Sequence, residues 1–83
     1  MNKNIIVTGG LGFIGSNLID LLINKKYLVI NLDKVSYSSN FYNLKEYKNH
    51  TKYKFIKCDL NSKKILSILM KYKPICIFNL AAE

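Results

Sequence analysis

Short apolar runs alternate along the chain with segments in which apolar residues recur every three or four positions. Six-residue runs of the length and composition of buried strands occupy positions 3–8, 27–32, 53–58 and 75–80. Helical spacing is found in 13–25 and 62–72, and a polar loop leads to a short helix expected over 41–48. The chain therefore reads as strands and helices in strict alternation.

Apolar residues at helical spacing support both of the longer helices. In the first helix, the apolar residues at helical spacing are Ile14, Leu18, Leu21 and Leu22. In the later helix they are Ile65, Leu66, Ile68 and Leu69. Pro74 follows that helix and is expected to end it.

Alternating strands and helices indicate an α/β fold with parallel strands joined by right-handed crossovers. We expect one partial domain over residues 1–83, the N-terminal part of a doubly wound Rossmann sheet. Its four strands would lie in the order 3-2-1-4, and the sheet would be truncated after the fourth. The reversal between strands 1 and 4 opens a crevice at the carboxyl ends of the strands, where ligands bind in such folds.

The segment Thr8-Gly9-Gly10-Leu11-Gly12-Phe13-Ile14-Gly15 links the first strand to the first helix. Gly9 would make the sharp turn out of the strand, and Gly12 would let the backbone approach a diphosphate closely. Gly15 would let the helix lie tightly on the sheet. The helix N-terminus then offers unpaired N–H groups and about half a positive charge to the phosphates. The alternative is a glycine turn with a purely geometric purpose, but the strand before it and the acid after it favour a dinucleotide site.

Asp33 stands at the carboxyl end of the second strand, 18 residues beyond Gly15. A carboxylate there can accept hydrogen bonds from both hydroxyls of an adenosine ribose. It would repel a 2′-phosphate by about 4 kcal/mol at a separation of about 4 Å, which favours NAD over NADP. Asp33 could instead serve only as a turn residue. Lys34 beside it could pair with that phosphate or be a solvated charge.

Two further strand ends carry candidate cofactor contacts. Asp59 could accept the amino group of adenine while Leu60 covers the ring, although capping of the next helix explains Asp59 equally well. The small residues of Leu80-Ala81-Ala82-Glu83 would let the centre of the cofactor pass close to the backbone, although such a pair of alanines is also ordinary in cores.

The composition argues against several classes of binding partner. The net charge of +8 comes from 13 lysines and no arginine, and the lysines are scattered, so we expect no nucleic-acid partner. No apolar stretch is long enough to span a bilayer and no signal peptide is evident, so we expect no membrane partner and cytoplasmic residence. Cys58 and Cys76 each lie in an apolar run and are expected to be buried free thiols, and with the lone His50 they give no metal site.

Taken together, these strings resemble the extended short-chain dehydrogenase/reductase family over the full 83 residues. Residues 8–15 are similar to its nucleotide loop, and Asn79 to Glu83 is similar to its fourth-strand signature. Residues 32–37, with Asn40, Asn43 and Leu44 after them, resemble the dTDP-glucose 4,6-dehydratases of that family. Ser36 and Ser38 stand where those relatives often have threonine and another small residue.

The resemblance implies which residues line an NAD site. Besides the glycines of the loop they are Phe13, Ile14, Asp33, Lys34, Val35, Ser36, Asp59, Leu60, Leu80, Ala81, Ala82 and Glu83. It further implies a nucleotide-sugar substrate, a homodimeric parent enzyme, and a reaction that oxidises the sugar at C4 by transient hydride transfer to NAD and eliminates water across C5 and C6. The catalytic residues would lie beyond Glu83, so we expect none in this chain.

One local motif imitates a catalytic pair. Tyr53 and Lys57 have the Tyr-x-x-x-Lys spacing, which requires a helix to bring the two side chains together. They fall in a predicted strand, where their Cα atoms would be about 13 Å apart, so we reject them as a catalytic pair. Two other functions stay open: a nucleotide-sugar 4-epimerase using the same cofactor half, and a non-catalytic nucleotide-binding module. An incomplete sheet with an open edge argues against the module.

Overall fold

The computed structural model describes residues 3–34, 47, 49–59 and 61–80. Four parallel strands form one sheet in the order β3-β2-β1-β4, which confirms the predicted topology. Their bounds are β1 Asn4–Thr8, β2 Leu28–Asp33, β3 Tyr53–Lys57 and β4 Cys76–Asn79. Each lies within one residue of the predicted run at either end. The short helix expected over 41–48 falls almost wholly outside the described residues.

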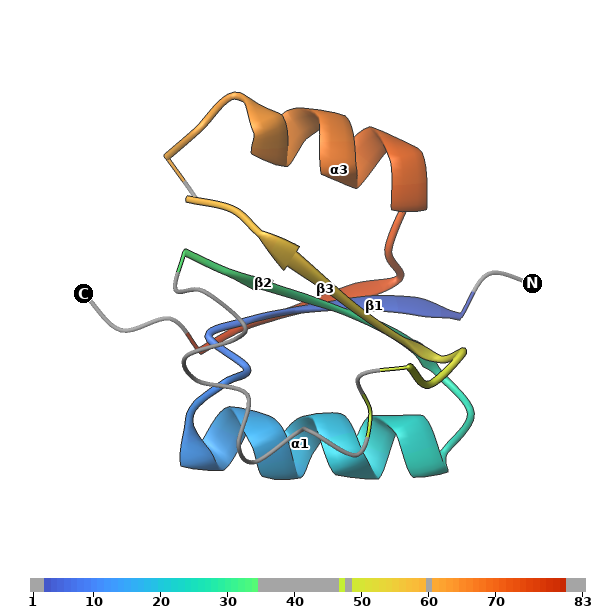
Figure 1. The fold of residues 1–83 in the computed structure, drawn as a ribbon. Helices are drawn as coiled ribbons and strands as arrows, with labels where there is room; N and C mark the ends of the chain where they lie inside the picture. The colour runs from blue at the N-terminus through green and yellow to red at the C-terminus, as the bar shows by residue number, and fades with distance from the viewer. Residues whose placement is uncertain (1–2, 35–46, 48, 60, 81–83) are drawn as a thin grey trace.

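The two helices cover opposite faces of the sheet (Figure 1). Helix α1, Phe13–Asn24, connects β1 to β2, and helix α3, Lys64–Tyr72, connects β3 to β4. Because every crossover between parallel strands must return along one face, the reversal of strand order puts α1 and α3 on different sides. Helix α3 ends at Tyr72, and its C-cap Lys73 adopts a left-handed conformation with φ 44° just before Pro74.

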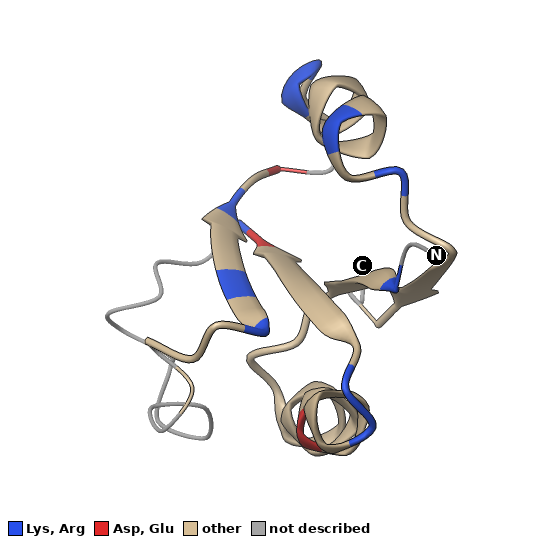
Figure 2. Ribbon diagram, turned by 90° about the vertical axis from the view of Figure 1, so that its right-hand side faces the viewer, with Lys and Arg blue, Asp and Glu red and all other residues tan. Residues whose placement is uncertain are grey.

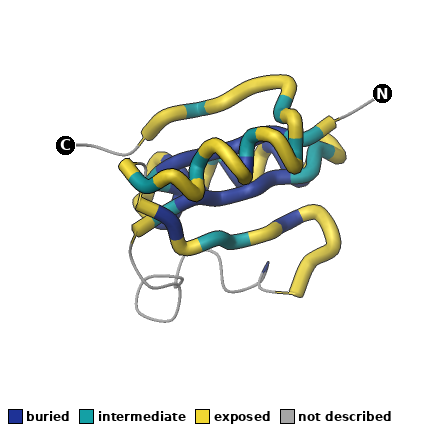
Figure 3. The backbone as a smooth tube through the Cα atoms, turned by 90° about the horizontal axis from the view of Figure 1, so that it is seen from above, coloured by how far each residue is buried: buried dark blue, intermediate teal, exposed yellow. Residues whose placement is uncertain are grey.

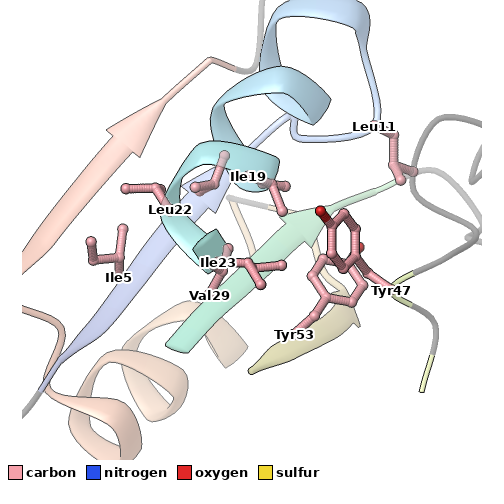
Figure 4. Close-up of a cluster of buried hydrophobic side chains, with 9 residues drawn as sticks. Ile5, Leu11, Ile19, Leu22, Ile23, Val29, Tyr47 and Tyr53 are labelled. Carbon is pink, nitrogen blue, oxygen red and sulfur yellow. The ribbon is translucent and has the colours of Figure 1, made fainter. Parts of the chain in front are cut away.

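Each face of the sheet has its own hydrophobic core. On the α1 side, Ile5, Val7 and Val29 of the strands pack with Ile19, Leu22 and Ile23 of the helix (Figure 4). On the α3 side, Ile68 of the helix packs with Ile6 of β1 and with Ile30 and Leu32 of β2. The alternation along β1 and β2 buries both faces of the central strands (Figure 3).

The buried face of α1 includes only part of its apolar pattern. Its buried residues are Gly15, Ser16, Ile19, Leu22 and Ile23. Ile14 is 73% exposed and Leu21 51% exposed, so these two residues of the helical pattern do not lie in the core. Apolar residues occur on more than one side of this helix, and the face with the small residues is the one that can approach the loop closely. In α3 the apolar residue Ile68 is buried and two of its neighbours are half-buried, whereas Leu66 is 63% exposed.

The two thiols also differ from each other. Cys58 is buried, as expected, whereas Cys76 is exposed, so its predicted burial was wrong. Cys76 lies on β4, one of the two edge strands of the sheet, where three of the four residues are exposed. An apolar run predicts a strand, but the burial of that strand depends on what lies beside it in the fold.

Candidate functional site

The loop between β1 and α1 is a tight turn held to the sheet. Gly9 has φ 73°, a left-handed conformation that favours glycine, and this confirms the predicted sharp turn. Its N–H donates to the carbonyl of Leu32 at 3.1 Å, so the turn begins against the neighbouring strand β2. The Gly12 N–H in turn donates to the Gly9 carbonyl at 3.5 Å.

Gly15 lies where the first turn of α1 crosses the loop. A Cβ built on Gly15 would stand 2.6 Å from both the Cα of Gly10 and the carbonyl oxygen of Gly9. The close approach required here is therefore between the helix and the loop backbone, whereas we had expected it between the helix and the sheet. The requirement for glycine is the same, because backbone atoms cannot rotate out of the way.

Gly12 has the opposite environment. It is the N-cap of α1, with φ −78° and ψ 176°, and no side chain caps the helix. A Cβ on Gly12 would have only the Gly9 carbonyl oxygen near it, at 3.9 Å. Glycine at this position thus leaves open space outside the helix start rather than relieving a clash within the chain.

The first turn of α1 is open to a ligand. Among the described residues, no acceptor is found for the backbone N–H groups of Phe13, Ile14 and Gly15. The side chains of Phe13 and Ile14 are 77% and 73% exposed. Three unpaired donors at a positive helix end are the features by which a helix start can hold an anion such as a diphosphate.

Strands β1 and β4 are joined at their carboxyl ends, the point where the strand order reverses. The Thr8 hydroxyl donates to Oδ1 of Asn79 at 2.5 Å, and the Leu80 N–H donates to the Thr8 carbonyl at 2.9 Å. Leu80 is exposed, as a residue lining the crevice would be. The strand ends between which the topology predicts a crevice are therefore linked by polar contacts.

Asp33 is the last residue of β2 and is half-buried. Its carbonyl accepts the Cys58 N–H at 2.8 Å, which ties the ends of β2 and β3 together. Lys34 is exposed, and Lys57 stands opposite Asp33 in the register of the two strands. Asp33 thus ends β2 at the same edge of the sheet as the glycine loop, and Figure 2 shows this acidic strand end beside basic positions on β3.

Asp59 lies two residues beyond β3 and is exposed. Its Oδ1 accepts the Asn61 N–H at 2.9 Å and its carbonyl accepts the Ser62 N–H at 2.9 Å. The carboxylate therefore closes a turn before α3 and does not cap the helix itself, which begins two residues later than predicted. The Ser62 hydroxyl accepts the N–H of Lys64, the first residue of the helix, at 2.9 Å.

Several predicted site residues lie outside the described residues, and their assignments stay predictions. They are Val35, Ser36, Leu60, Ala81, Ala82 and Glu83. The rejected Tyr-x-x-x-Lys pair lies in β3, a strand, as predicted.

A residue of the candidate site that the sequence analysis missed is Asn31. It has no exposed surface, and its Oδ1 accepts the Gly10 N–H at 3.1 Å while its Nδ2 donates to the Tyr53 hydroxyl at 3.1 Å. A Cβ on Gly10 would stand 2.5 Å from Oδ1 of Asn31, so this glycine also has a packing role. The available signal was the single amide in the otherwise apolar run 27–32.

The strand order, the open helix start after a glycine turn and the acid ending β2 define a Rossmann-class nucleotide-binding domain. The chain belongs to the GDP-mannose 4,6 dehydratase family, whose model matches residues 6–83. Among the described residues, no helix is both long and apolar enough to cross a membrane.

Individual relatives agree with this family. The chain is 49% identical to a dTDP-glucose 4,6-dehydratase of Haemophilus influenzae over 96% of its own length and 24% of the relative's. It is 40% identical to a UDP-glucose 4-epimerase of Mycolicibacterium smegmatis over 94% of its length and 25% of the relative's. The chain thus spans about a quarter of these relatives.

A solved structure shows the same fold. The crystal structure of dTDP-glucose 4,6-dehydratase from Bacillus anthracis in complex with NAD superposes with a TM-score of 0.86 at 37% identity, covering 98% of this chain and 27% of that one. The resemblance to dTDP-glucose 4,6-dehydratases inferred from the sequence is confirmed.

Proposed function

We propose that this chain binds NAD and forms the cofactor-binding part of a nucleotide-sugar 4,6-dehydratase that acts on dTDP-glucose. The observation that carries the proposal is the uncapped start of α1, with unpaired N–H groups at Phe13 to Gly15, at the same sheet edge as Asp33. The relatives with this fold include dTDP-glucose 4,6-dehydratases, one of them a complex with NAD.

The residues present fit the dinucleotide. The diphosphate would accept hydrogen bonds from the open amides of α1, and the space left by Gly12 lets it approach the backbone. The carboxylate of Asp33 would accept hydrogen bonds from the adenosine ribose. Phe13, Ile14 and Leu80 are exposed beside these groups and would exclude water from the bound cofactor.

When bound, NAD supplies a reversible hydride acceptor for the sugar. The part of this chain is to hold and orient it: the helix start fixes the diphosphate, and the acid fixes the adenosine end. We place no catalytic side chain among the 83 residues. The full proposed reaction converts dTDP-glucose to dTDP-4-keto-6-deoxyglucose with net loss of water and no net change in NAD.

The choice of NAD over NADP is proposed to rest on Asp33. At the edge of a protein, a carboxylate about 4 Å from a 2′-phosphate raises the free energy of the complex by up to about 4 kcal/mol. The neighbouring Lys34 and Lys57 reduce that repulsion, so we expect an NAD preference of at least about tenfold, which is about 1.4 kcal/mol.

The test is calorimetric titration of the full-length protein encoded by the gene with NAD and with NADP. The variant Asp33→Asn removes the charge and keeps the shape, and we expect it to bind NAD more weakly and to lose most of the discrimination. Asp20→Asn is the matched control: this exposed acid of α1 accepts from the Tyr47 hydroxyl, and asparagine keeps an acceptor oxygen for that contact, so neither affinity should change. Tight NADP binding by the unaltered protein would contradict the assignment of Asp33.

Turnover distinguishes the two candidate reactions. Incubation with dTDP-glucose should give a 4-keto-6-deoxy product that has lost one water, detected by mass spectrometry. The epimerase relative at 40% identity makes a 4-epimerase the second candidate, and an isomeric product of unchanged mass would identify it. NAD binding without turnover of any nucleotide sugar would favour a non-catalytic module.

We further propose that the parent enzyme is a cytoplasmic homodimer without a nucleic-acid partner. The described lysines are all exposed and lie on α3, β3 and several turns rather than on one face (Figure 2). Such a distribution does not match the continuous basic stripe that nucleic-acid binding requires. Cell fractionation, light scattering and salt-dependent retention on DNA test these three statements.

A further inference from the structure

The amide of Asn31 occupies a position where an apolar side chain would be expected. It lies in β2 with no exposed surface, between Ile30 and Leu32, which are also fully buried. Burying an amide costs free energy unless each polar atom finds a partner. Both do here, with the Gly10 N–H on one side and the Tyr53 hydroxyl on the other.

The hydrogen bond to Gly10 fixes more than one atom. The peptide group between Gly9 and Gly10 is planar and trans, so its N–H and its carbonyl point in opposite directions. Because Asn31 draws the N–H into the interior, the Gly9 carbonyl is turned toward the start of α1. It accepts the Gly12 N–H there, and it is the atom that a Cβ on Gly15 would meet at 2.6 Å.

This peptide group needs an external constraint. Two successive glycines have the greatest conformational freedom of any pair, and Gly9 is already in the left-handed region with φ 73°. Without an acceptor in the interior, the peptide between Gly9 and Gly10 could rotate. The Gly9 carbonyl would then turn away from the start of α1 and lose its hydrogen bond with the Gly12 N–H. The unpaired N–H groups that follow Gly12 would no longer be held in position.

Tyr53 holds the amide in the required orientation. Its hydroxyl accepts from Nδ2, which leaves Oδ1 directed at Gly10. The ring of Tyr53 packs beside Tyr47, with ring centroids 6.3 Å apart, in the same core as Ile19 (Figure 4). The orientation of Asn31 is therefore set by packed residues on β3 and the crossover before it.

We propose that Asn31, held by Tyr53, is a positioning residue that locks the glycine loop in its dinucleotide-binding shape before the ligand arrives. The inference rests on the proposed NAD function. Asn31 acts through the peptide between Gly9 and Gly10 and does not touch the cofactor. Replacing the Asn31 amide lowers the fraction of molecules whose loop can bind the dinucleotide. The apparent Kd for NAD rises by the same factor by which that fraction falls.

The test compares Asn31→Leu with Ile30→Ala in the full-length protein. Asn31→Leu keeps the approximate volume and removes both hydrogen bonds. Ile30→Ala destabilises the same strand on the opposite face, where the residue packs in the α3-side core. We expect Asn31→Leu to raise the Kd for NAD about tenfold, as a fall of the competent fraction to about one tenth would do. The folded Ile30→Ala protein should bind NAD as the unaltered protein does, and Tyr53→Phe should give a smaller rise of about threefold.

A second measurement needs no ligand. Amide hydrogen exchange of isotope-labelled glycine, followed by NMR, reports whether the Gly10 N–H is held. We expect a protected Gly10 amide in the unaltered protein and in Ile30→Ala, and loss of protection in Asn31→Leu.

Two outcomes would overturn the inference by different routes. If Asn31→Leu binds NAD as tightly as Ile30→Ala does, the lock is refuted while the proposed function stands. If the unaltered protein binds no NAD although Gly10 is protected, the proposed function fails and the positioning role fails with it.

Discussion

Two glycine-to-alanine substitutions distinguish Gly15, which we expect to matter for stability, from Gly12, which we expect to matter for ligand binding. In Gly15→Ala the new methyl group would stand 2.6 Å from the Gly10 Cα and from the Gly9 carbonyl oxygen. Both are backbone atoms, so helix and loop must separate, and overpacking of this kind costs up to about 3 kcal/mol. Alanine regains at most about 1 kcal/mol of helix propensity. The net loss of unfolding free energy is therefore about 2 kcal/mol.

Gly12→Ala provides the matched control. Its φ of −78° and ψ of 176° suit alanine, and the new methyl group would meet only the Gly9 carbonyl oxygen, at an ordinary 3.9 Å. Losing glycine as the N-cap costs less than about 1 kcal/mol. The methyl group would, however, occupy the space that a diphosphate needs, so affinity for NAD should fall by more than about tenfold, or about 1.4 kcal/mol.

Urea denaturation followed by circular dichroism measures the first quantity and calorimetry the second. For a domain of this size, a loss of about 2 kcal/mol lowers the melting temperature by about 8–16 °C. If Gly15→Ala is as stable as Gly12→Ala, the packing of α1 on the loop is not as described. If Gly12→Ala binds NAD normally, the diphosphate does not lie at the helix start.

Three further predictions follow from burial and contacts. Ile19→Ala should lower the unfolding free energy by about 2–5 kcal/mol because the side chain is fully buried, whereas Leu21→Ala, at a half-exposed site on the same helix, should change it by less than about 1 kcal/mol in urea denaturation. Tyr47→Phe should cost about 1 kcal/mol, since its hydroxyl donates to a carboxylate on α1, and an unchanged thermal midpoint would contradict that contact. Under native conditions a thiol reagent should label Cys76 rapidly and Cys58 only on unfolding, as followed by mass spectrometry of tryptic peptides. Faster labelling of Cys58 than of Cys76 would contradict the burial described.

The sequence alone determined the described strands and helices, their order and the sheet edge at which the candidate site lies. Strand and helix periods depend on residues close together in the chain, and the handedness of crossovers then leaves few arrangements, so 3-2-1-4 could be predicted. The glycine turn and Asp33 could be placed at the carboxyl edge of the sheet for the same reason. Gly9 is in the left-handed region, as the turn required.

Tertiary structure decided what each of these residues contacts. Helix α1 buries Ile19 rather than Leu21, although both are apolar and both belong to a regular helical pattern. Gly15 packs against the loop, and Asn31 bonds Gly10 from a strand 21 residues away. A local pattern records only neighbours along the chain, whereas burial and hydrogen bonding depend on atoms brought together by folding. The residue that holds the site's shape was therefore visible only in three dimensions.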